Sequence, residues 1–531
     1  MSESATISPD AMALWRPKSS PWWIAFTVMS ATFMEVLDTS IANVSLPNIA
    51  GNLSAGIDES TWVLTSYLVS NAIVLPLSGW LSTLFGRKRL FMICVTIFIG
   101  SSLMCGLAPT LGTLVVFRIL QGAGGGSLQP LAQAILAESF PPAKRGMAMA
   151  IYAMGVVVAP IVGPTVGGWI TDNYTWRWIF FINVPVGVIS LMLMSVFLED
   201  PPYLRRRDLK TLKIDYIGLG LIAVGLGALQ LVLDKGQRED WLESSFIIVT
   251  MAVSAVAMVA GVLWELRSKD PMVELHLLKD RNFMGSVIIM FLLGFVLYGS
   301  MAMLPIFLQT LMGYTAMLSG MVLSPGGIVT LAALPVVGWL LGKVEARKLV
   351  VVGVLVTAGS LFYMSLFNTE IGYWTPVTSR LAMGLGLAFL FVPINTMAFH
   401  FIAKERMNYA SGLINLARNI GGSCGIAFSV TWLARASQVH QVQLISHLSP
   451  LNPAFQNATR GAAAALMAHG SGAVQASAQA AALLYGGMQQ QAAMLAFNEV
   501  FFVQGMAFLL LLPLLFLMKK VETHKSEIPA H

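Results

Sequence analysis

Fourteen long runs of apolar residues constrain this chain more than any other feature of its sequence. A run of about 20 apolar residues spans the hydrocarbon core of a bilayer as a helix, because a helix satisfies its own backbone hydrogen bonds. Only 11% of the 531 residues are charged, against roughly 25% in soluble domains. We therefore predict an all-α membrane protein with 14 transmembrane helices. The runs lie near residues 23–46, 60–82, 91–108, 112–134, 147–170, 177–197, 214–233, 245–265, 285–311, 317–342, 348–368, 374–401, 407–434 and 499–518.

Lysine and arginine residues lie mostly on one side of the predicted spans. Of the 32, 24 flank the spans on that side and five on the other, while Arg118, Arg380 and Arg418 fall inside spans. Cytoplasmic flanks are enriched in these residues, so we predict that both termini are cytoplasmic. The same bias accounts for the net charge of +6, so no nucleic-acid partner is expected. Residues 1–20 lack the apolar core and cleavage site of a signal peptide.

The sequence lacks the residue patterns of common catalytic sites. It contains no Walker-type phosphate loop, Ser/His/Asp constellation or metal-ligand spacing. Cys94, Cys105 and Cys424 fall in predicted spans without paired spacing, which argues against a disulfide framework or a zinc site. We therefore expect a carrier and not an enzyme, with no metal and no cofactor.

The two halves of the chain resemble each other at a nearly constant offset. Pro47 of "SLPNIAGNL" matches Pro305 of "MLPIFLQTL" at 258 residues, and Arg118 of "RILQG" matches Arg380 of "RLAMG" at 262. Parallel repeats of six helices, with a substrate cavity between them, are typical of the major facilitator fold. We therefore predict two six-helix repeats with a two-helix insert. The segments are 1–20 (cytoplasmic), 21–200 (first half), 201–284 (linker and insert), 285–518 (second half, including an external loop at 436–498) and 519–531 (cytoplasmic tail).

A basic, glycine-containing loop, "GWLSTLFGRKRLF" at residues 79–91, follows the second predicted span. It resembles the signature loop between the second and third helices of major facilitator transporters. A cluster that only sets membrane orientation is the alternative. The family usually has an aspartate where this chain has Thr83, which leaves open whether the usual charge-relay gate operates. The resemblance implies a gating role for Gly79, Gly86, Arg87 and Lys88.

Two further motifs resemble those of the same family. "RILQGAGGGSLQP" at 118–130 resembles the fourth-helix motif, in which a buried arginine takes part in proton coupling, here Arg118. "GVVVAPIVGPTVGG" at 155–168 resembles the fifth-helix motif of antiporters, as distinct from symporters. Small residues at every fourth position favour close helix packing, and generic packing is the alternative. The antiporter-motif residues are Gly155, Pro160, Gly163, Pro164, Gly167 and Gly168.

Together with "LDTSIANVSLPNIAGNL" and "NYTWRWIFFINVPVG", these motifs make the whole chain resemble the EmrB-type multidrug exporters of the major facilitator superfamily. The resemblance implies proton-driven export of lipophilic drugs across the bacterial inner membrane, with a periplasmic adaptor and an outer-membrane channel as partners. It leaves substrate identity open, because pocket shape decides it and fold does not. An exporter of a physiological amphiphile such as a fatty acid, bile salt or siderophore is an alternative. A symporter or a non-transporting scaffold is less favoured.

Two carboxylates, Glu35 and Asp38 of "MEVLDTSIANVSLP", lie inside the first apolar run. Residues three apart share a helix face, and a lipid-facing position is untenable, so we expect both to face the central cavity. Their repulsion there favours a proton on at least one, as a proton carrier requires. We predict that Glu35, Asp38 and Arg118 couple protons; a static buried network is the alternative. The residues expected to line the substrate cavity are Tyr67, Gln121, Phe295 and Tyr298.

The external loop at 436–498 is too long for a simple turn. It is rich in alanine and glutamine, which are good helix formers. We expect short helices that pack on the outer surface, either as a docking surface for the adaptor or as a spacer.

Overall fold

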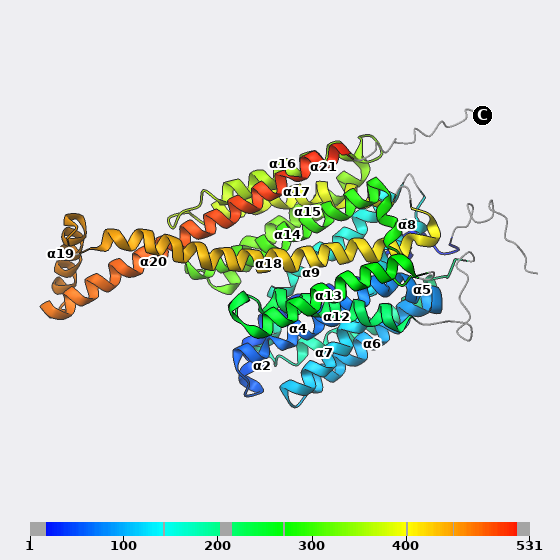
Figure 1. Ribbon diagram of the computed structural model, residues 1–531, viewed down its shortest axis with the longest axis horizontal. Helices are drawn as coiled ribbons and strands as arrows, with labels where there is room; N and C mark the ends of the chain where they lie inside the picture. Colours follow the sequence, from blue (N-terminus) through cyan, green and yellow to red (C-terminus); the bar gives the residue numbers. More distant parts are fainter. Residues whose placement is uncertain are drawn as a thin grey trace, which may run out of the picture.

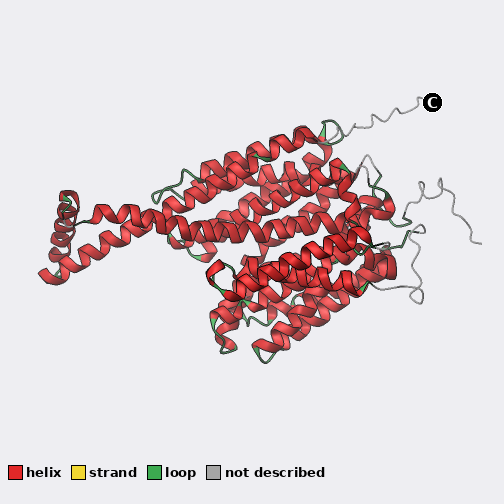
Figure 2. Cartoon of the chain, viewed as in Figure 1, coloured by secondary structure: helices red, strands yellow, loops and turns green. Residues whose placement is uncertain are grey.

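The computed structural model describes residues 17–141, 144–201, 215–268, 271–399, 402–449 and 451–517. Within these residues every regular element is a helix (Figure 2). Twelve helices there are long and apolar enough to cross a membrane. The predicted terminal segments, 1–20 and 519–531, lie almost wholly outside the described residues, as does most of the linker that begins at 201.

The first half of the chain forms one bundle of helices (Figure 1). Pro76 interrupts the second helix with one tight turn, because proline removes a backbone donor. Gly86 adopts a φ of 79°, which favours glycine and lets the chain reverse into the next helix. The elements are α2 (Pro21–Asn52), α3 (Ile57–Ser60), α4 (Trp62–Val74), η1 (Leu75–Leu77), α5 (Ser78–Phe85), α6 (Arg87–Leu107), α7 (Leu111–Gly125), α8 (Leu128–Ser139), α9 (Arg145–Asn173), α10 (Trp178–Phe181) and α11 (Asn183–Phe197).

Two helices form the insert between the halves: α12 (Tyr216–Lys235) and α13 (Ser245–Arg267), with η3 (Trp241–Glu243) between them. They pack on each other, and α12 also packs on α4 of the first half. Ser423 of the second half donates to the Gln230 amide oxygen in α12 at 3.0 Å. The insert therefore contacts both halves.

The second half repeats the bundle and adds a long extension. Its elements are η4 (Leu275–Lys279), α14 (Arg281–Thr310), α15 (Ala316–Leu340), α16 (Ala346–Met364), α17 (Trp374–Phe399), η5 (Lys404–Arg406), α18 (Met407–Ile445), η6 (Ser446–Leu448), α19 (Pro453–Ala468), α20 (Ala473–Leu509) and α21 (Leu511–Leu517). The twelve apolar helices match twelve of the fourteen predicted runs. The fourth run corresponds to α7 with α8, two helices of 15 and 12 residues, each too short to span alone. The thirteenth corresponds to α18, which contains more polar residues.

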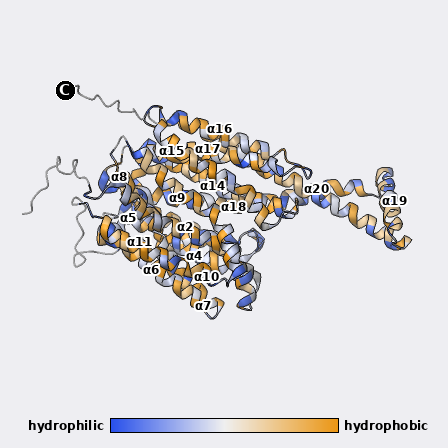
Figure 3. Cartoon of the chain, turned by 180° about the vertical axis from the view of Figure 1, so that it is seen from behind, coloured by the Kyte–Doolittle hydropathy of each residue, from blue (hydrophilic) through white to orange (hydrophobic). Residues whose placement is uncertain are grey.

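Large hydrophobic side chains are exposed on many helices of the bundle, and Figure 3 shows hydrophobic residues along the length of these helices. Val256 of α13 is 71% exposed and Val196 of α11 is 68% exposed. Exposed apolar surface of this extent marks a membrane or protein interface. The chain is therefore a multi-pass membrane protein.

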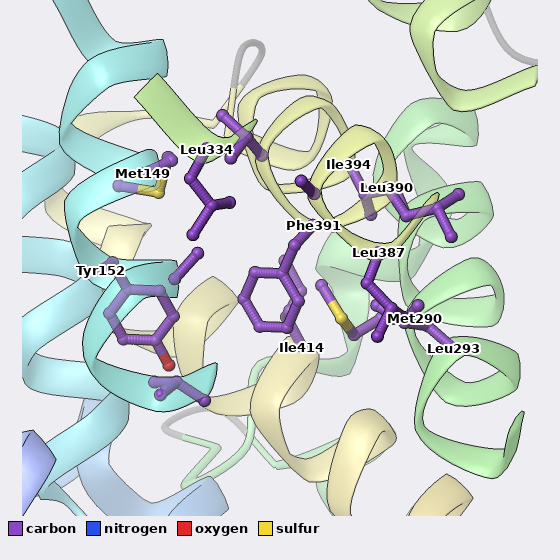
Figure 4. Packing of buried hydrophobic residues seen from close by; sticks show 14 of the residues in the cluster. Met149, Tyr152, Met290, Leu293, Leu334, Leu387, Leu390, Phe391, Ile394 and Ile414 are labelled. Atoms are coloured by element: carbon purple, nitrogen blue, oxygen red, sulfur yellow. The ribbon is translucent and has the colours of Figure 1, made fainter. Parts of the chain in front are cut away.

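Hydrophobic residues of both halves also pack together inside the molecule (Figure 4). The ring of Phe391 in α17 lies between Tyr152 of α9 and Leu293 of α14, and the Tyr152 and Phe391 ring centroids are 6.3 Å apart. Helices α9 and α15, one from each half, lie against each other. The two repeats therefore share a core.

The external loop differs from the sequence expectation. Helix α18 has 39 residues and is about 58 Å long, well beyond the roughly 30 Å of a hydrocarbon core. It and α20 run out of the bundle, and α19 joins their far ends (Figure 1). The prediction of short helices lying on the outer surface is wrong, because residues 436–445 continue α18 and the alanine-rich residues 473–498 continue α20 without a break. We call residues 436–498 the external arm.

Candidate functional site

Asp38 of α2 lies in a buried cluster with side chains from α7 and α11. The Arg118 guanidinium donates to its carboxylate at 2.6 Å, from Nη1 to Oδ2, and both side chains are at most 1% exposed. Gln121 Nε2 and Asn183 Nδ2 donate to the other carboxylate oxygen at 3.0 and 2.6 Å. Four groups from three helices thus hold one charged pair away from solvent.

Arg118 has further partners that fix its orientation. Its Nε donates to the Val63 carbonyl at 3.0 Å, and Nη1 donates to the Gln121 side-chain oxygen at 2.8 Å. The Tyr67 ring lies 4.3 Å from the guanidinium carbon, a cation–π distance. Because a buried charge needs partners, Arg118 and Asp38 depend on each other.

Glu35 is buried one helical turn before Asp38 but has a different set of partners. The Tyr67 hydroxyl and Asn71 Nδ2 donate to Oε1 at 3.1 and 3.4 Å, and Gln129 Nε2 donates to Oε2 at 2.7 Å. The structure therefore places both carboxylates inside the bundle, each in its own hydrogen-bond network. Tyr67 touches both networks, because its hydroxyl bonds to Glu35 and its ring packs on Arg118.

Amide side chains connect the Glu35 network to the second half. Arg418 of α18 donates through Nη2 to the Gln129 side-chain oxygen. One turn further along α8, Gln133 bonds to Asn395 and accepts from Asn415 at 2.6 Å. Of these residues the sequence analysis named only Arg418, as an arginine inside a span, and it missed the four amides, although glutamine and asparagine inside apolar runs are themselves a signal of internal polar contacts.

A cavity lies between α9 of the first half and four helices of the second half. Its volume in this conformation is only about 30 Å³. Tyr298 lines it, as do Arg380 and Arg418. Tyr67 and Gln121 lie instead in the carboxylate networks, and the Phe295 ring contacts Phe428 at 5.4 Å. Of the four residues expected to line the substrate cavity, only Tyr298 is among the lining residues.

The antiporter-motif glycines bring α9 close to α2. A Cβ on Gly155 would lie 2.0 Å from Met29 Cε, and one on Gly163 would lie 2.4 Å from Ser40 Oγ. Gly167 contacts Ile41 in the same way, whereas a Cβ on Gly168 would meet nothing within 4 Å. Ser40 Oγ also donates to the Pro160 carbonyl at 3.2 Å, while the Pro164 side chain lies outside the described residues.

Residues 79–91 comprise most of α5, Gly86 and the start of α6, and they join the halves at the end of the bundle rich in basic residues. A Cβ on Gly79 would lie 2.6 Å from the Tyr409 ring. Arg87 pairs with Glu138 through two hydrogen bonds, one of them 2.7 Å between Nη2 and Oε1, and also donates to the Lys404 carbonyl at 3.4 Å. Lys88 donates from its backbone to Asp200 at 2.8 Å.

Comparisons with known proteins agree with this architecture. The Major Facilitator Superfamily model matches residues 28–426. The chain is 37% identical to the multidrug export protein EmrB of Haemophilus influenzae, covering 91% of this chain and 92% of that protein. It is also 37% identical to the fatty acid resistance protein FarB of Neisseria gonorrhoeae, covering 94% and 96%. A solved structure of a double Trp mutant of XylE matches with a TM-score of 0.61 at 15% identity, covering 94% of this chain and 96% of XylE. The chain therefore belongs to the major facilitator superfamily, and it is a transporter and not an enzyme.

Proposed function

We propose that this protein is a proton-driven antiporter that exports lipophilic drugs and toxic compounds across the inner membrane of a bacterium. The buried Asp38–Arg118 pair is the observation that carries the proposal. An ionisable pair inside the membrane is costly and is retained where it moves ions or protons. The similarity to relatives named multidrug export proteins supports the choice of substrate.

In this mechanism a proton from the outside neutralises a carboxylate of the Glu35 and Asp38 networks. Neutral Asp38 no longer forms an ion pair with Arg118. Neutral Glu35 accepts a weaker hydrogen bond from Gln129, the residue that bonds to Arg418 of the other half. Loss of the proton to the cytoplasm restores both networks. Proton binding thus biases how the halves pack, and substrate binding in the cavity beside Arg418 biases it in turn.

We further propose that α7 with α8 and α18 cross the membrane, which gives fourteen spans. Arg87 is the first residue of α6 and Arg145 is the first residue of α9, and both belong to the basic side of the bundle. For both to be cytoplasmic, the chain between them must cross twice, through α6 and then through α7 with α8. The same reasoning applies to Lys404 before α18 and Lys519 after α21. Both termini are then cytoplasmic.

The direction of proton movement tests the antiporter. Inverted vesicles loaded with the protein and made acidic inside expose the cytoplasmic face to added drug. We expect drug addition to make the lumen more alkaline, because each exported molecule is exchanged for protons. A symporter would make the lumen more acidic, and a scaffold that binds drug without transport would leave its pH unchanged. Either of these results would exclude export by exchange.

The external arm suits a docking surface for a periplasmic adaptor that leads to an outer-membrane channel. Its residues, 436–498, contain no aspartate or glutamate and one arginine, Arg460. Ala463, Ala476 and Ala480 pack α19 on α20, which holds the arm together. At the base of the arm, a hydrogen bond of 2.8 Å between His440 Nε2 and Glu499 Oε1 joins α18 to α20.

Removal of the arm tip separates transport from docking. We expect replacement of residues 446–472 by a short glycine–serine linker to leave drug–proton exchange in vesicles within about twofold of wild type, because no described residue of the tip hydrogen-bonds to either carboxylate network. Crosslinking to the adaptor should fall at least tenfold relative to a matched chain with only His469→Ala. Undiminished crosslinking would remove the docking proposal.

Export of a physiological amphiphile is the second candidate. The relative FarB is named a fatty acid resistance protein, and the similarity covers 94% of this chain. Fatty acids and drugs compete in the vesicle experiment if one cavity serves both.

A further inference from the structure

A second buried guanidinium, that of Arg380 in α17, lines the cavity beside Arg418. Arg380 is 4% exposed. Its Nη1 lies 3.2 Å from the Met383 sulfur, a weak acceptor, and its Nε has no hydrogen-bond partner. Among the described residues no carboxylate pairs with it. Arg380 therefore carries a buried charge without a counter-charge.

The repeat shows which partner is missing. Arg380 occupies the position that Arg118 has in the first half, where Asp38 neutralises it. At the offset of 258 residues that relates Pro47 to Pro305, Asp38 corresponds to Val296 and Glu35 to Leu293. Both are buried apolar residues. The second half has thus kept the arginine without either carboxylate.

The charges of the two networks and the cavity do not balance. Among the described residues, the two networks and the cavity together contain three buried arginines and two buried carboxylates. The arginines are Arg118, Arg380 and Arg418, and the carboxylates are Glu35 and Asp38. With both carboxylates ionised, one positive charge is left over. Burial of an uncompensated charge is unfavourable, so the site is complementary to a ligand with one negative charge.

Apart from Tyr298, Thr330 and Arg418, the rest of the cavity lining is apolar and comes from both halves. Val156 contributes from α9, Leu297 and Met301 from α14, and Leu387 and Phe391 from α17. Such a lining suits an aliphatic or aromatic body, and one charged group among apolar walls fixes its orientation. The cavity therefore combines the guanidinium groups of Arg380 and Arg418 with apolar walls, and of the two only Arg418 is hydrogen-bonded to the Glu35 network.

We propose that this cavity, widened when the two halves that line it move apart, binds amphiphilic monoanions, with the anionic head on the Arg380 guanidinium and the apolar body against Leu387 and Phe391. The inference names the substrate class of the proposed exporter and rests on that proposed function. Close packing holds Arg380 in place, because its carbonyl would lie 2.6 Å from a Cβ on Gly326. Thr330 also donates to the Gly384 carbonyl at 2.8 Å, which ties α15 to α17 one turn after Arg380.

Binding to the full chain in lipid nanodiscs tests the proposal without a proton gradient. The probes are octanoate, octanol and octyltrimethylammonium, which share a chain and differ in head-group charge. We expect wild type to bind octanoate at least about tenfold more tightly than octyltrimethylammonium, as one charge-assisted pair in an apolar site provides. Arg380→Gln should weaken octanoate binding about tenfold or more and leave octanol binding unchanged.

Two variants serve as controls. Arg380→Lys keeps the charge and should bind octanoate more tightly than Arg380→Gln does, whereas Arg435→Gln removes an exposed arginine of α18 and should bind all three probes as wild type does. If Arg380→Gln does not give monodisperse protein, the ranking of the probes on wild type decides. Octanoate binding that is equal in wild type and Arg380→Gln, or wild type that binds the cation as tightly as octanoate, would overturn the proposal.

The two proposals fail in different ways. Anion-selective binding without drug–proton exchange in vesicles would overturn the antiporter and leave the Arg380 site in place. Intact exchange with cation-selective binding would overturn the Arg380 site and leave the antiporter in place.

Discussion

Asp38→Asn is expected to abolish proton-linked export while substrate binding persists. An amide cannot take up and release a proton, so we expect substrate-linked proton flux to fall ~100-fold or more, the scale of a lost proton-transfer group. Asparagine also leaves Arg118 without its counter-charge, although the Val63 carbonyl and Gln121 still accept from it. The measurement is lumenal pH in proteoliposomes after addition of substrate, together with binding of the same substrate.

Asp234→Asn is the matched control for this prediction. Asp234 is also a carboxylate within an apolar helix, α12, where it accepts from Thr65 outside both carboxylate networks. We expect Asp234→Asn to retain coupling. Glu35→Gln in the same assay tests whether coupling also requires the Glu35 network. Coupling in Asp38→Asn equal to wild type would show that this carboxylate is structural and that the proton is carried elsewhere.

Gly421→Val is expected to prevent stable packing of the second half. A Cβ at Gly421 would lie 2.0 Å from the Phe291 carbonyl oxygen, and a Cβ at Gly425 would lie 2.0 Å from the Phe295 carbonyl oxygen. Backbone atoms of α14 cannot move aside as a flexible side chain can, so α14 and α18 must separate. Overpacking of this kind costs about 3 kcal/mol or more. It also displaces Arg418, which is three residues before Gly421.

Thermal unfolding and the yield of monodisperse protein in detergent measure this effect. Gly359→Val in α16 is the control, because a Cβ there would meet nothing within 4 Å. We expect Gly359→Val to unfold within a few degrees of wild type and Gly421→Val to give little folded protein. Equal unfolding temperatures for the two variants would show that the α14–α18 contact tolerates a wider spacing.

The elements of this fold could be predicted because hydropathy and charge are local properties of a membrane chain. Twelve predicted apolar runs are helices of spanning length, and the parallel repeat pointed to the family that the comparisons show. Asp38 and Arg118 could be named for a related reason. A charge within an apolar run has to turn inward to a partner, whatever that partner is.

The hydrogen-bond partners within the candidate site could not be predicted. Gln129 and Arg418 are 289 residues apart, and nothing in either run fixes the rotation that brings their side chains together. The position of the external arm was missed because alanine and glutamine indicate helix but not its direction or its continuity with a span.

The sequence by itself determined the helices, the repeat and the presence of five charged residues within apolar runs, away from the ends of those runs: Glu35, Asp38, Arg118, Arg380 and Arg418. Only the tertiary structure decided that Arg118 is neutralised, that Arg418 reaches the Glu35 network and that Arg380 has no carboxylate. The reason is physical: the cost of burying a charge acts at each residue, whereas its compensation depends on which helices pack side by side.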